Sequence, residues 1–166
     1  MQDLVELASR GDRDAFAALA SASVDRLFAI ARRILQDNER AQDAVQSALM
    51  GAWRDLPSLR DPQRFQPWLN KLLVRACYEE AHKDRAYRRT VRVITMEPAE
   101  PDRSSWLADR DQLERAFRRL NVEQRAVVVL HFYLGLALKD AAEVLAIPEG
   151  TARSRLHYAP RMMRSA

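Results

Sequence analysis

The chain has 166 residues, a formal net charge of +4 and a pI near 9.6, and 48% of its residues are hydrophobic while 30% are charged. This composition is ordinary for a globular protein of one domain or two small ones. Its single cysteine, Cys77, excludes an internal disulfide and a cysteine-based metal site. The N-terminal segment lacks a signal-peptide pattern and no apolar run approaches the length of a membrane span, so we expect a cytoplasmic protein without membrane insertion.

Hydrophobic periodicity predicts helices throughout the first half of the chain. Apolar residues recur at helical spacing over Leu27 to Ile34, Ala41 to Trp53 and Leu69 to Cys77, and no segment alternates as a strand would. Asp37-Asn38 and the stretch from Leu56 to Pro62 interrupt this pattern, since a residue before proline is disfavoured in the α region.

The periodicity stops near Arg89 and returns about twenty residues later. The segment between carries Pro98 and Pro101 among acidic residues, a composition typical of a linker. We therefore expect an all-α protein in which two small helical domains, residues 1–89 and 110–166, are joined by a linker, residues 90–109.

The sequence pattern of the second half of the chain predicts a helix-turn-helix. Asn121 followed by Gln124 has the form of a capping box at a helix start, and Gly135 suits a helix end with positive φ. A short helix from Leu138 to Leu145 is followed by a tight turn. A second helix follows, because Pro148 favours the first turn of a helix.

The second of these helices divides into two faces. Ala152 and Leu156 recur on one face, while Arg153, Ser154 and His157 share the other, which could enter a DNA major groove. The alternative interpretation is a solvated amphipathic helix. Pro160 removes a backbone hydrogen bond and should kink or end the helix.

Taken together, the two halves resemble the extracytoplasmic-function (ECF) type of bacterial sigma factor, which keeps only sigma regions 2 and 4 joined by a linker. The order and spacing of the motifs carry this resemblance more than any one motif. In the sequence they are Gly11-Asp12-Arg13-Asp14-Ala15-Phe16, Leu27-Phe28-Ala29-Ile30-Ala31-Arg32-Arg33, Asp43-Ala44-Val45-Gln46, Ala52-Trp53-Arg54, Phe65-Gln66-Pro67-Trp68-Leu69, Leu120-Asn121-Val122-Glu123-Gln124-Arg125, Ala141-Ala142-Glu143-Val144-Leu145 and Pro148-Glu149-Gly150-Thr151-Ala152-Arg153-Ser154-Arg155-Leu156-His157.

The resemblance implies a polymerase-docking helix in the first half. The residues that it places against core RNA polymerase share the helix face opposite the apolar stripe, where plain solvation is the alternative interpretation. They are Asp43, Gln46, Ser47 and Arg54.

The resemblance also implies that the loop from Leu59 to Phe65 and the helix after it capture the minus-10 promoter element. Phosphate-binding cations there alternate with an aromatic residue on which a base could stack. The predicted residues are Asp61, Arg64, Phe65, Lys71, Arg75 and Tyr78, with His82 on the same stripe as the last three. Trp68 could stack on a base too, but it begins an apolar face and is better interpreted as a core residue.

For the minus-35 element the resemblance implies contacts from the helix-turn-helix, made by Thr151, Arg153, Ser154, Arg155 and Tyr158. It implies three partners, which are core RNA polymerase, promoter DNA and an anti-sigma factor, and no cofactor or metal. Several residues depart from the family pattern. Ser47 stands where Glu is usual on the docking face, and Ala76 stands where Asn is common in the strand-binding helix. Ala137 replaces a Ser or Thr helix cap, and Ala146 takes the turn position usually given to Gly.

No enzymatic constellation competes with this interpretation. The three histidines are scattered and no glycine-rich phosphate loop occurs, so we expect no enzyme; a metal-dependent nuclease using Asp43, Asp55 and Asp61 is the weak alternative. The stronger alternative is a helix-turn-helix regulator that binds duplex DNA alone and never docks on polymerase.

Overall fold

The computed structural model describes residues 1–88, 115 and 117–164, within which every regular element is helical and no strand occurs. The predicted all-α class is confirmed, while the predicted linker, residues 90–109, lies outside the described residues.

We refer to residues 1–88 as the N-terminal part and to the described residues from 115 onward as the C-terminal part. The N-terminal part contains α1 (Gln2–Ser9), α2 (Arg13–Leu35), α3 (Asn38–Asp55), the 3₁₀ turns η1 (Leu56–Ser58) and η2 (Pro62–Arg64), and α4 (Phe65–Arg88). The C-terminal part contains α6 (Val122–Val128), the π-helical turn η3 (Val129–Tyr133), α7 (Leu138–Val144) and α8 (Glu149–Arg164).

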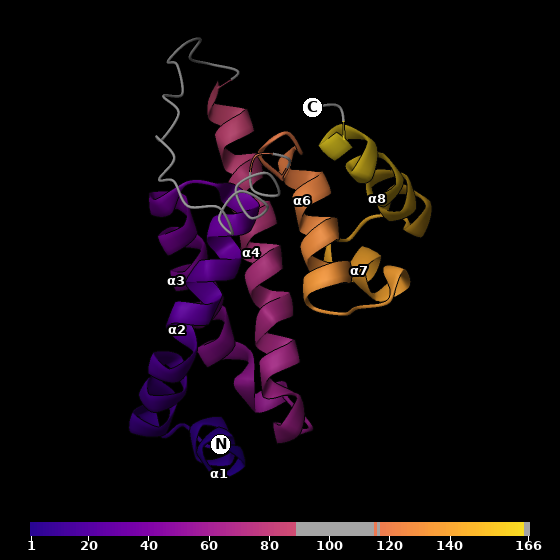
Figure 1. The fold of residues 1–166 in the computed structure, drawn as a ribbon. Coiled ribbons are helices and arrows are strands. Elements are labelled where there is room, and N and C mark those ends of the chain that lie inside the picture. The colour runs from indigo at the N-terminus through magenta and orange to yellow at the C-terminus, as the bar shows by residue number, and fades with distance from the viewer. Residues whose placement is uncertain (89–114, 116, 165–166) are drawn as a thin grey trace, which may run out of the picture.

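Helices α2, α3 and α4 lie side by side and form the body of the N-terminal part, with α1 across one end (Figure 1). The stripe of α3 that faces its neighbours is mostly alanine, Ala41, Ala44, Ala48 and Ala52, and all four are buried. Small side chains let the helix backbones approach closely, so that large residues such as Leu73 of α4 fill the remaining space. This packing fixes the exposed faces of α3 and α4 relative to each other.

The long helices begin and end where the sequence indicates. Asp12 and Asp37 each cap a helix, because their carboxylates accept the backbone N–H of Ala15 and Arg40 at 3.0 Å. Between α2 and α3 the chain reverses through Gln36, whose φ is 56°. Helix α3 ends at Asp55, before Pro57, as predicted.

The C-terminal part forms the predicted helix-turn-helix. The capping box of Asn121 and Gln124 is present at the start of α6, and Gly135 follows η3 with φ 69°. Ala137 provides no side-chain cap for α7, as expected from its residue type. Ala146 takes φ 51° in the turn, a left-handed conformation that favours Gly and is strained for Ala.

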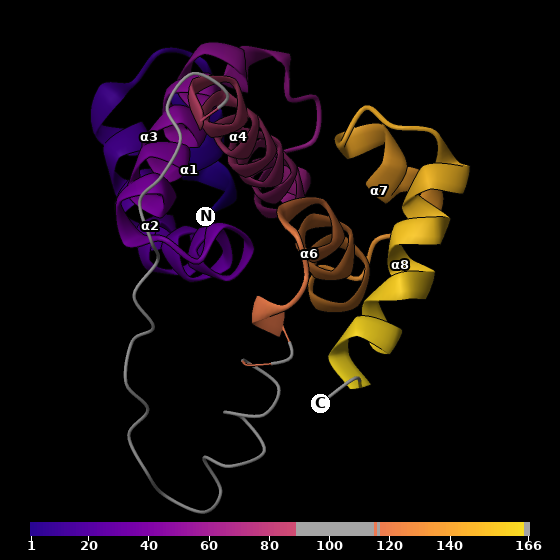
Figure 2. The same cartoon turned by 90° about the horizontal axis from the view of Figure 1, so that it is seen from above.

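The two parts pack against each other. Helix α6 lies against α2 and α4, and α7 approaches α4 (Figure 2). Buried residues of α6 and of the helix-turn-helix join the same hydrophobic core as those of α2, α3 and α4. The arrangement therefore brings the two regions with predicted DNA contacts side by side.

Candidate nucleic-acid and polymerase interfaces

The outer face of α8 is exposed as the sequence predicts. Ala152 and Ala159 are buried, whereas Arg153, Ser154 and Tyr158 are exposed and Thr151 is half-buried. The carboxylate of Glu149 accepts a hydrogen bond from Nη2 of Arg153 at 2.7 Å, which holds the guanidinium on the outer face. The face presents this guanidinium to solvent, where DNA would compete with Glu149 for it.

Helix α8 does not end at Pro160. The helix continues to Arg164, so of the two expected effects of Pro160, a kink or an end of the helix, the end is wrong. Proline removes only its own backbone N–H, and a helix whose apolar face is buried through Ala152 and Ala159 can lose one such bond.

Arg155 points away from this outer face. Its side chain is half-buried, and Nη1 donates to the hydroxyl of Tyr78 on α4 at 3.5 Å. The structure therefore joins a residue predicted to read the minus-35 element to one predicted to bind the minus-10 strand.

The predicted strand-binding residues of α4 lie on one stripe, which we call the strand face: Lys71, Arg75, Tyr78 and His82. Lys71 and Arg75 are exposed, and Arg75 pairs with Glu79 at 3.3 Å. The rings of Tyr78 and His82 meet edge to face with centroids 4.3 Å apart. The stripe combines cations with an aromatic ring, the chemistry that single-stranded DNA requires.

The loop before α4 is ordered by its own side chains. Asp61 accepts the backbone N–H of Gln63 at 3.0 Å, and its other carboxylate oxygen lies 3.4 Å from Nε of Arg64. Both side chains are exposed. Asp61 therefore shapes the loop, and Arg64 remains at its surface.

The structure contradicts the prediction for Phe65. The prediction placed it against DNA, but the side chain is only 2% exposed and belongs to the core, where its ring packs 6.1 Å from that of Trp68. Phe65 is the first residue of α4 and lies at the end of the apolar face of that helix. Burying its ring in the core stabilises the fold more than leaving the ring exposed at the surface would. Trp68 is half-buried against the same core, in line with its predicted role.

A polar network that the sequence analysis missed fixes the start of α4. Nη2 of Arg26 donates to Oε1 of Gln66 at 2.8 Å and to Oδ1 of Asn70 at 2.7 Å, and Gln66 reaches Ser23 at 3.4 Å. Ser23 and Asn70 are buried, so these bonds satisfy groups that would otherwise be costly inside the protein. No local sequence signal pairs residues forty positions apart.

The predicted docking face of α3 is exposed: Asp43, Gln46, Ser47 and Arg54 all lie at the surface. The guanidinium of Arg54 is held by Asp55 in a two-fold contact of 2.8 and 2.9 Å. Hydrogen bonding raises the pKa of Arg54 and lowers that of Asp55, so both stay charged. A partner that binds Arg54 must share it with Asp55.

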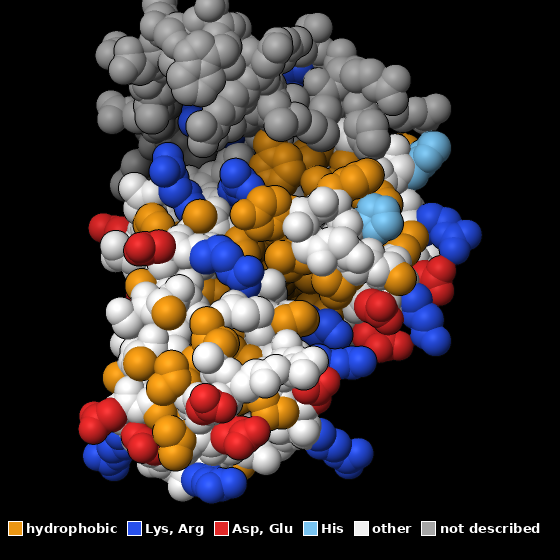
Figure 3. Space-filling model, turned by 60° about the horizontal axis from the view of Figure 1, so that its bottom comes forward, with side chains coloured by type: hydrophobic (Ala, Val, Ile, Leu, Met, Phe, Trp, Pro, Cys, Tyr) orange, Lys and Arg blue, Asp and Glu red, His pale blue; other side chains and the backbone are white. Residues whose placement is uncertain are grey.

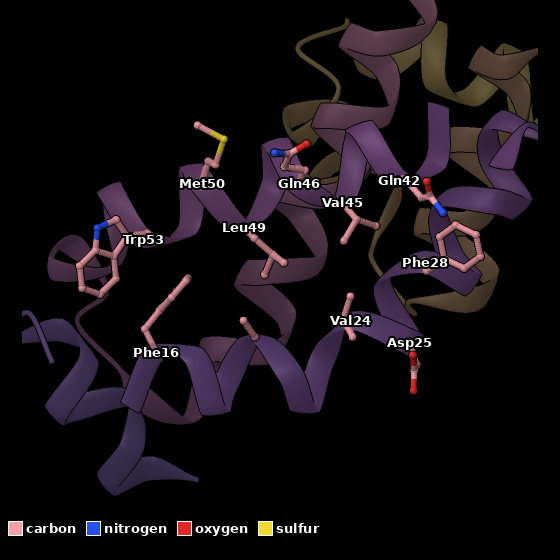
Figure 4. A pocket seen from close by; sticks show the side chains of 11 residues that line it. Phe16, Val24, Asp25, Phe28, Gln42, Val45, Gln46, Leu49, Met50 and Trp53 are labelled. Atoms are coloured by element: carbon pink, nitrogen blue, oxygen red, sulfur yellow. The ribbon is translucent and has the colours of Figure 1, made fainter. Parts of the chain in front are cut away.

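An apolar groove of about 770 Å³ runs between α2 and α3 beside this docking face (Figure 4). Phe16, Val24 and Phe28 line it from α2, and Leu49 and Met50 line it from α3. Met50 is 67% exposed, which is unusual for a large apolar side chain. The sequence signal was present, since Met50 falls on the otherwise polar face of α3.

Charge is dispersed over the face of the molecule in Figure 3, where acidic and basic side chains alternate instead of forming one basic field. Within residues 1–88 and 117–164, no group of three or more metal-ligating side chains occurs. Among the described helices none has the length and apolar character needed to cross a membrane.

Comparison with known proteins identifies two regions of the chain. Residues 19–89 match the family Sigma-70 region 2, and residues 110–161 match the family Sigma-70, region 4. Among solved structures, the chain is similar to the sigma factor RpoE of Bartonella quintana in complex with the anti-sigma factor NepR, with a TM-score of 0.68, 23% identity, and coverage of 90% of this chain and 94% of that one. It is also similar to CnrH in complex with the cytosolic domain of CnrY, with a TM-score of 0.59 at 22% identity over 98% and 93% of the two chains. These likenesses concern the fold.

Two relatives from Mycobacterium tuberculosis show the family. The ECF RNA polymerase sigma factor SigM is 34% identical over 147 residues, which cover 87% of this chain and 73% of SigM. The ECF RNA polymerase sigma factor SigL is 33% identical over 163 residues, which cover 93% of this chain and 92% of SigL. Because both sigma regions occur in one chain that is at least 33% identical to these relatives and covers 73% of SigM and 92% of SigL, the protein belongs to the ECF RNA polymerase sigma factors, a family of transcription regulators and not of enzymes.

Proposed function

We propose that this sigma factor binds core RNA polymerase through α3 and contacts promoters at two places, the minus-10 element with the N-terminal part and the minus-35 element with α8. The observation that carries the proposal is that the interaction positions fall on three separate helices, where all of them are exposed except Tyr78, Thr151 and Arg155, which are half-buried. The docking residues Asp43, Gln46, Ser47 and Arg54 lie on α3, the strand-binding residues Lys71, Arg75 and Tyr78 lie on α4, and Thr151, Arg153, Ser154, Arg155 and Tyr158 lie on α8. Asp61 and Arg64 complete the minus-10 set from the loop before α4.

The proposal assigns residues 1–89 to polymerase docking and minus-10 binding, and residues 110–166 to minus-35 binding, with residues 90–109 as the linker. Opening DNA by this means needs no covalent chemistry. Contacts to bases and phosphates of the separated strand offset an unstacking cost of a few kcal/mol for each extruded base. Useful affinity arises when both parts engage the same promoter, because the linker sets their effective concentration.

We also propose an anti-sigma factor as a partner and the cytoplasm as the site of action. The neighbouring RpoE structure contains the anti-sigma factor NepR, and a protein that works with polymerase on chromosomal DNA acts where that DNA lies. No cofactor is required by any step of the proposal.

The docking assignment is tested with the double variant Asp43→Ala and Gln46→Ala. Because both residues are exposed, the melting temperature should stay close to that of the wild type, while binding to core polymerase and run-off transcription should be lost. The matched control replaces Gln2 and Asp3, an exposed pair of the same residue types on α1. Normal core binding by the double variant would refute the docking face.

The alternative, a regulator that acts without polymerase, gives a different result in the same assay. Such a protein would bind one duplex sequence specifically and would not be retained by core polymerase. Specific transcription by wild-type protein with core polymerase excludes this alternative.

A further inference from the structure

Helix α8 presents an acid beside an arginine at its first turn. Oε1 of Glu149 lies 2.7 Å from Nη2 of Arg153, and the two side chains are 45% and 71% exposed. The carbonyl of Pro148 accepts the backbone N–H groups of Thr151 and Ala152, which fixes the start of the helix at Glu149. The pair therefore occupies the end of the helix from which the recognition helix of a helix-turn-helix contacts base edges.

The fold gives only a weak reason for a carboxylate at this place. Exposed ion pairs one turn apart stabilise a helix slightly, and an acid at the positive end of the helix dipole has an effect of similar size. On a face that meets DNA, the same carboxylate is repelled by phosphates. Its position becomes favourable for DNA binding when Arg153 neutralises its charge and a base donates a hydrogen bond to it.

The residue after Glu149 leaves room for a close approach. A Cβ added to Gly150 would meet no atom of the described chain within 4 Å, and the φ of Gly150 lies outside the left-handed region. The local structure therefore does not require glycine, which is less stable than alanine within a helix. A bare backbone at Gly150 allows DNA to come close to the first turn of α8.

The donors and acceptors of the pair match two different bases. A guanidinium has five N–H donors, so Arg153 can bond to O6 and N7 of a guanine while Nη2 still donates to Glu149. The second oxygen of the carboxylate can accept from the N4 amino group of a cytosine. Side chains one turn apart have β-carbons about 5–6 Å apart, farther than the roughly 3.4 Å between stacked base pairs, so the two groups reach successive pairs.

We propose that Glu149 is a specificity-determining residue for the minus-35 element: Arg153 binds a guanine, and Glu149, held beside it, accepts from a cytosine in the next base pair. This inference rests on the proposed function, because α8 is assigned to that element there. It names the base step that the first turn of α8 selects. Since the pair carries no net charge, it contributes to discrimination between sequences more than to sequence-independent binding.

The first experiment selects promoters with the full chain bound to core RNA polymerase, from a library randomised across the minus-35 element. The wild type should enrich a guanine followed or preceded by a cytosine. Glu149→Gln should keep the guanine and shift the neighbouring preference from cytosine to adenine by about five- to tenfold, because a glutamine amide matches N6 and N7 of adenine. Glu149 is exposed, so the melting temperature should stay close to that of the wild type.

Two further variants separate base reading from charge and from helix stability. Glu143→Gln removes the same charge from an exposed position on α7 and should leave every base preference unchanged. Glu149→Asp keeps the charge at the start of α8 but shortens its reach, so the cytosine preference should fall without a gain for adenine. If Glu149 only stabilised the helix, Glu149→Asp would select the same sequences as the wild type.

The second experiment measures binding of the same polymerase complex to a labelled duplex that carries the sequence enriched by the wild type. Glu149→Gln should weaken this binding when Arg153 is present. In the Arg153→Ala background it should strengthen binding by about twofold or more, because the carboxylate is then left without its cation and is repelled by phosphates. Glu143→Gln should have the same effect in both backgrounds.

A cytosine preference that survives Glu149→Gln overturns the inference, and so does a change of the same sign in both backgrounds. A wild-type complex that enriches no base in this element contradicts the proposed function itself, and the inference with it. The two failures are therefore distinguished by the wild-type selection alone.

Discussion

The two parts of the molecule reach their structure by different means. In the N-terminal part, α2, α3 and α4 have 18 to 24 residues each, their apolar faces pack against one another, and the starts of α2 and α3 are capped. In the C-terminal part, α6 and α7 have only 7 residues each, and the buried set includes the charged residues Glu123 and Arg125. Helices this short are not stable alone. The comparison teaches that α6 and α7 depend on packing against α8 and the N-terminal part for their stability, whereas α2, α3 and α4 supply most of the shared core.

The largest expected effect tests this dependence in the core. Leu73→Ala empties a fully buried site in α4 and should lower the free energy of unfolding by about 2–5 kcal/mol, and both parts should unfold together. Leu130→Ala removes an equally buried side chain from the C-terminal part and should leave the N-terminal part folded. Denaturant titration gives the energies, and reaction of buried Cys77 with a thiol reagent shows whether the N-terminal part has opened.

Leu7→Ala on α1 serves as the control for truncation, since Leu7 is 45% exposed and should be nearly neutral. Helices α6 to α8 that stay folded in Leu73→Ala would mean that the C-terminal part is stable by itself, and the comparison above would be wrong.

A smaller effect is expected on DNA binding, where two arginines of α8 should differ. Arg153→Ala should weaken minus-35 duplex binding by about 1–3 kcal/mol, with relaxed preference at one base, if the side chain contacts a guanine edge. Arg155→Ala should weaken duplex binding less, because its guanidinium is half-buried and hydrogen-bonded to Tyr78 and does not lie on the outer face. Fluorescence anisotropy on duplexes with single base substitutions measures both. Equal weakening of Arg153→Ala on every sequence would indicate a phosphate contact.

The smallest expected effect concerns the side-chain caps at the starts of two helices. Asp37→Ala removes the cap of α3 and should cost about 1 kcal/mol of stability. Ala137→Ser supplies α7 with the hydroxyl that it lacks and should gain about as much. Thermal unfolding of the two variants gives the sign directly. A loss in Ala137→Ser would mean that the backbone of that residue cannot present its side chain to α7.

Local patterns predicted much of this fold. Helical periodicity located α2, α3 and the body of α4, and the capping box of Asn121 and Gln124 located the start of α6. These features depend on residues within one or two helical turns of each other, so a short stretch of sequence is enough to predict them. The prediction for Phe65 was wrong because periodicity alone does not show whether an aromatic residue near the edge of an apolar face is buried or exposed.

The sequence by itself therefore determined the helical class, the breaks before and after α3, the start of α6 and the helix-turn-helix, because backbone hydrogen bonding and side-chain period are local. Only the tertiary structure decided that Arg155 meets Tyr78, that Arg26 joins Gln66 and Asn70, and that Arg125 ends against Ile34. Each of these contacts joins residues between 40 and 91 positions apart. Such pairs depend on how whole helices pack, and the free energy that selects the packing is summed over many side chains that no short pattern contains.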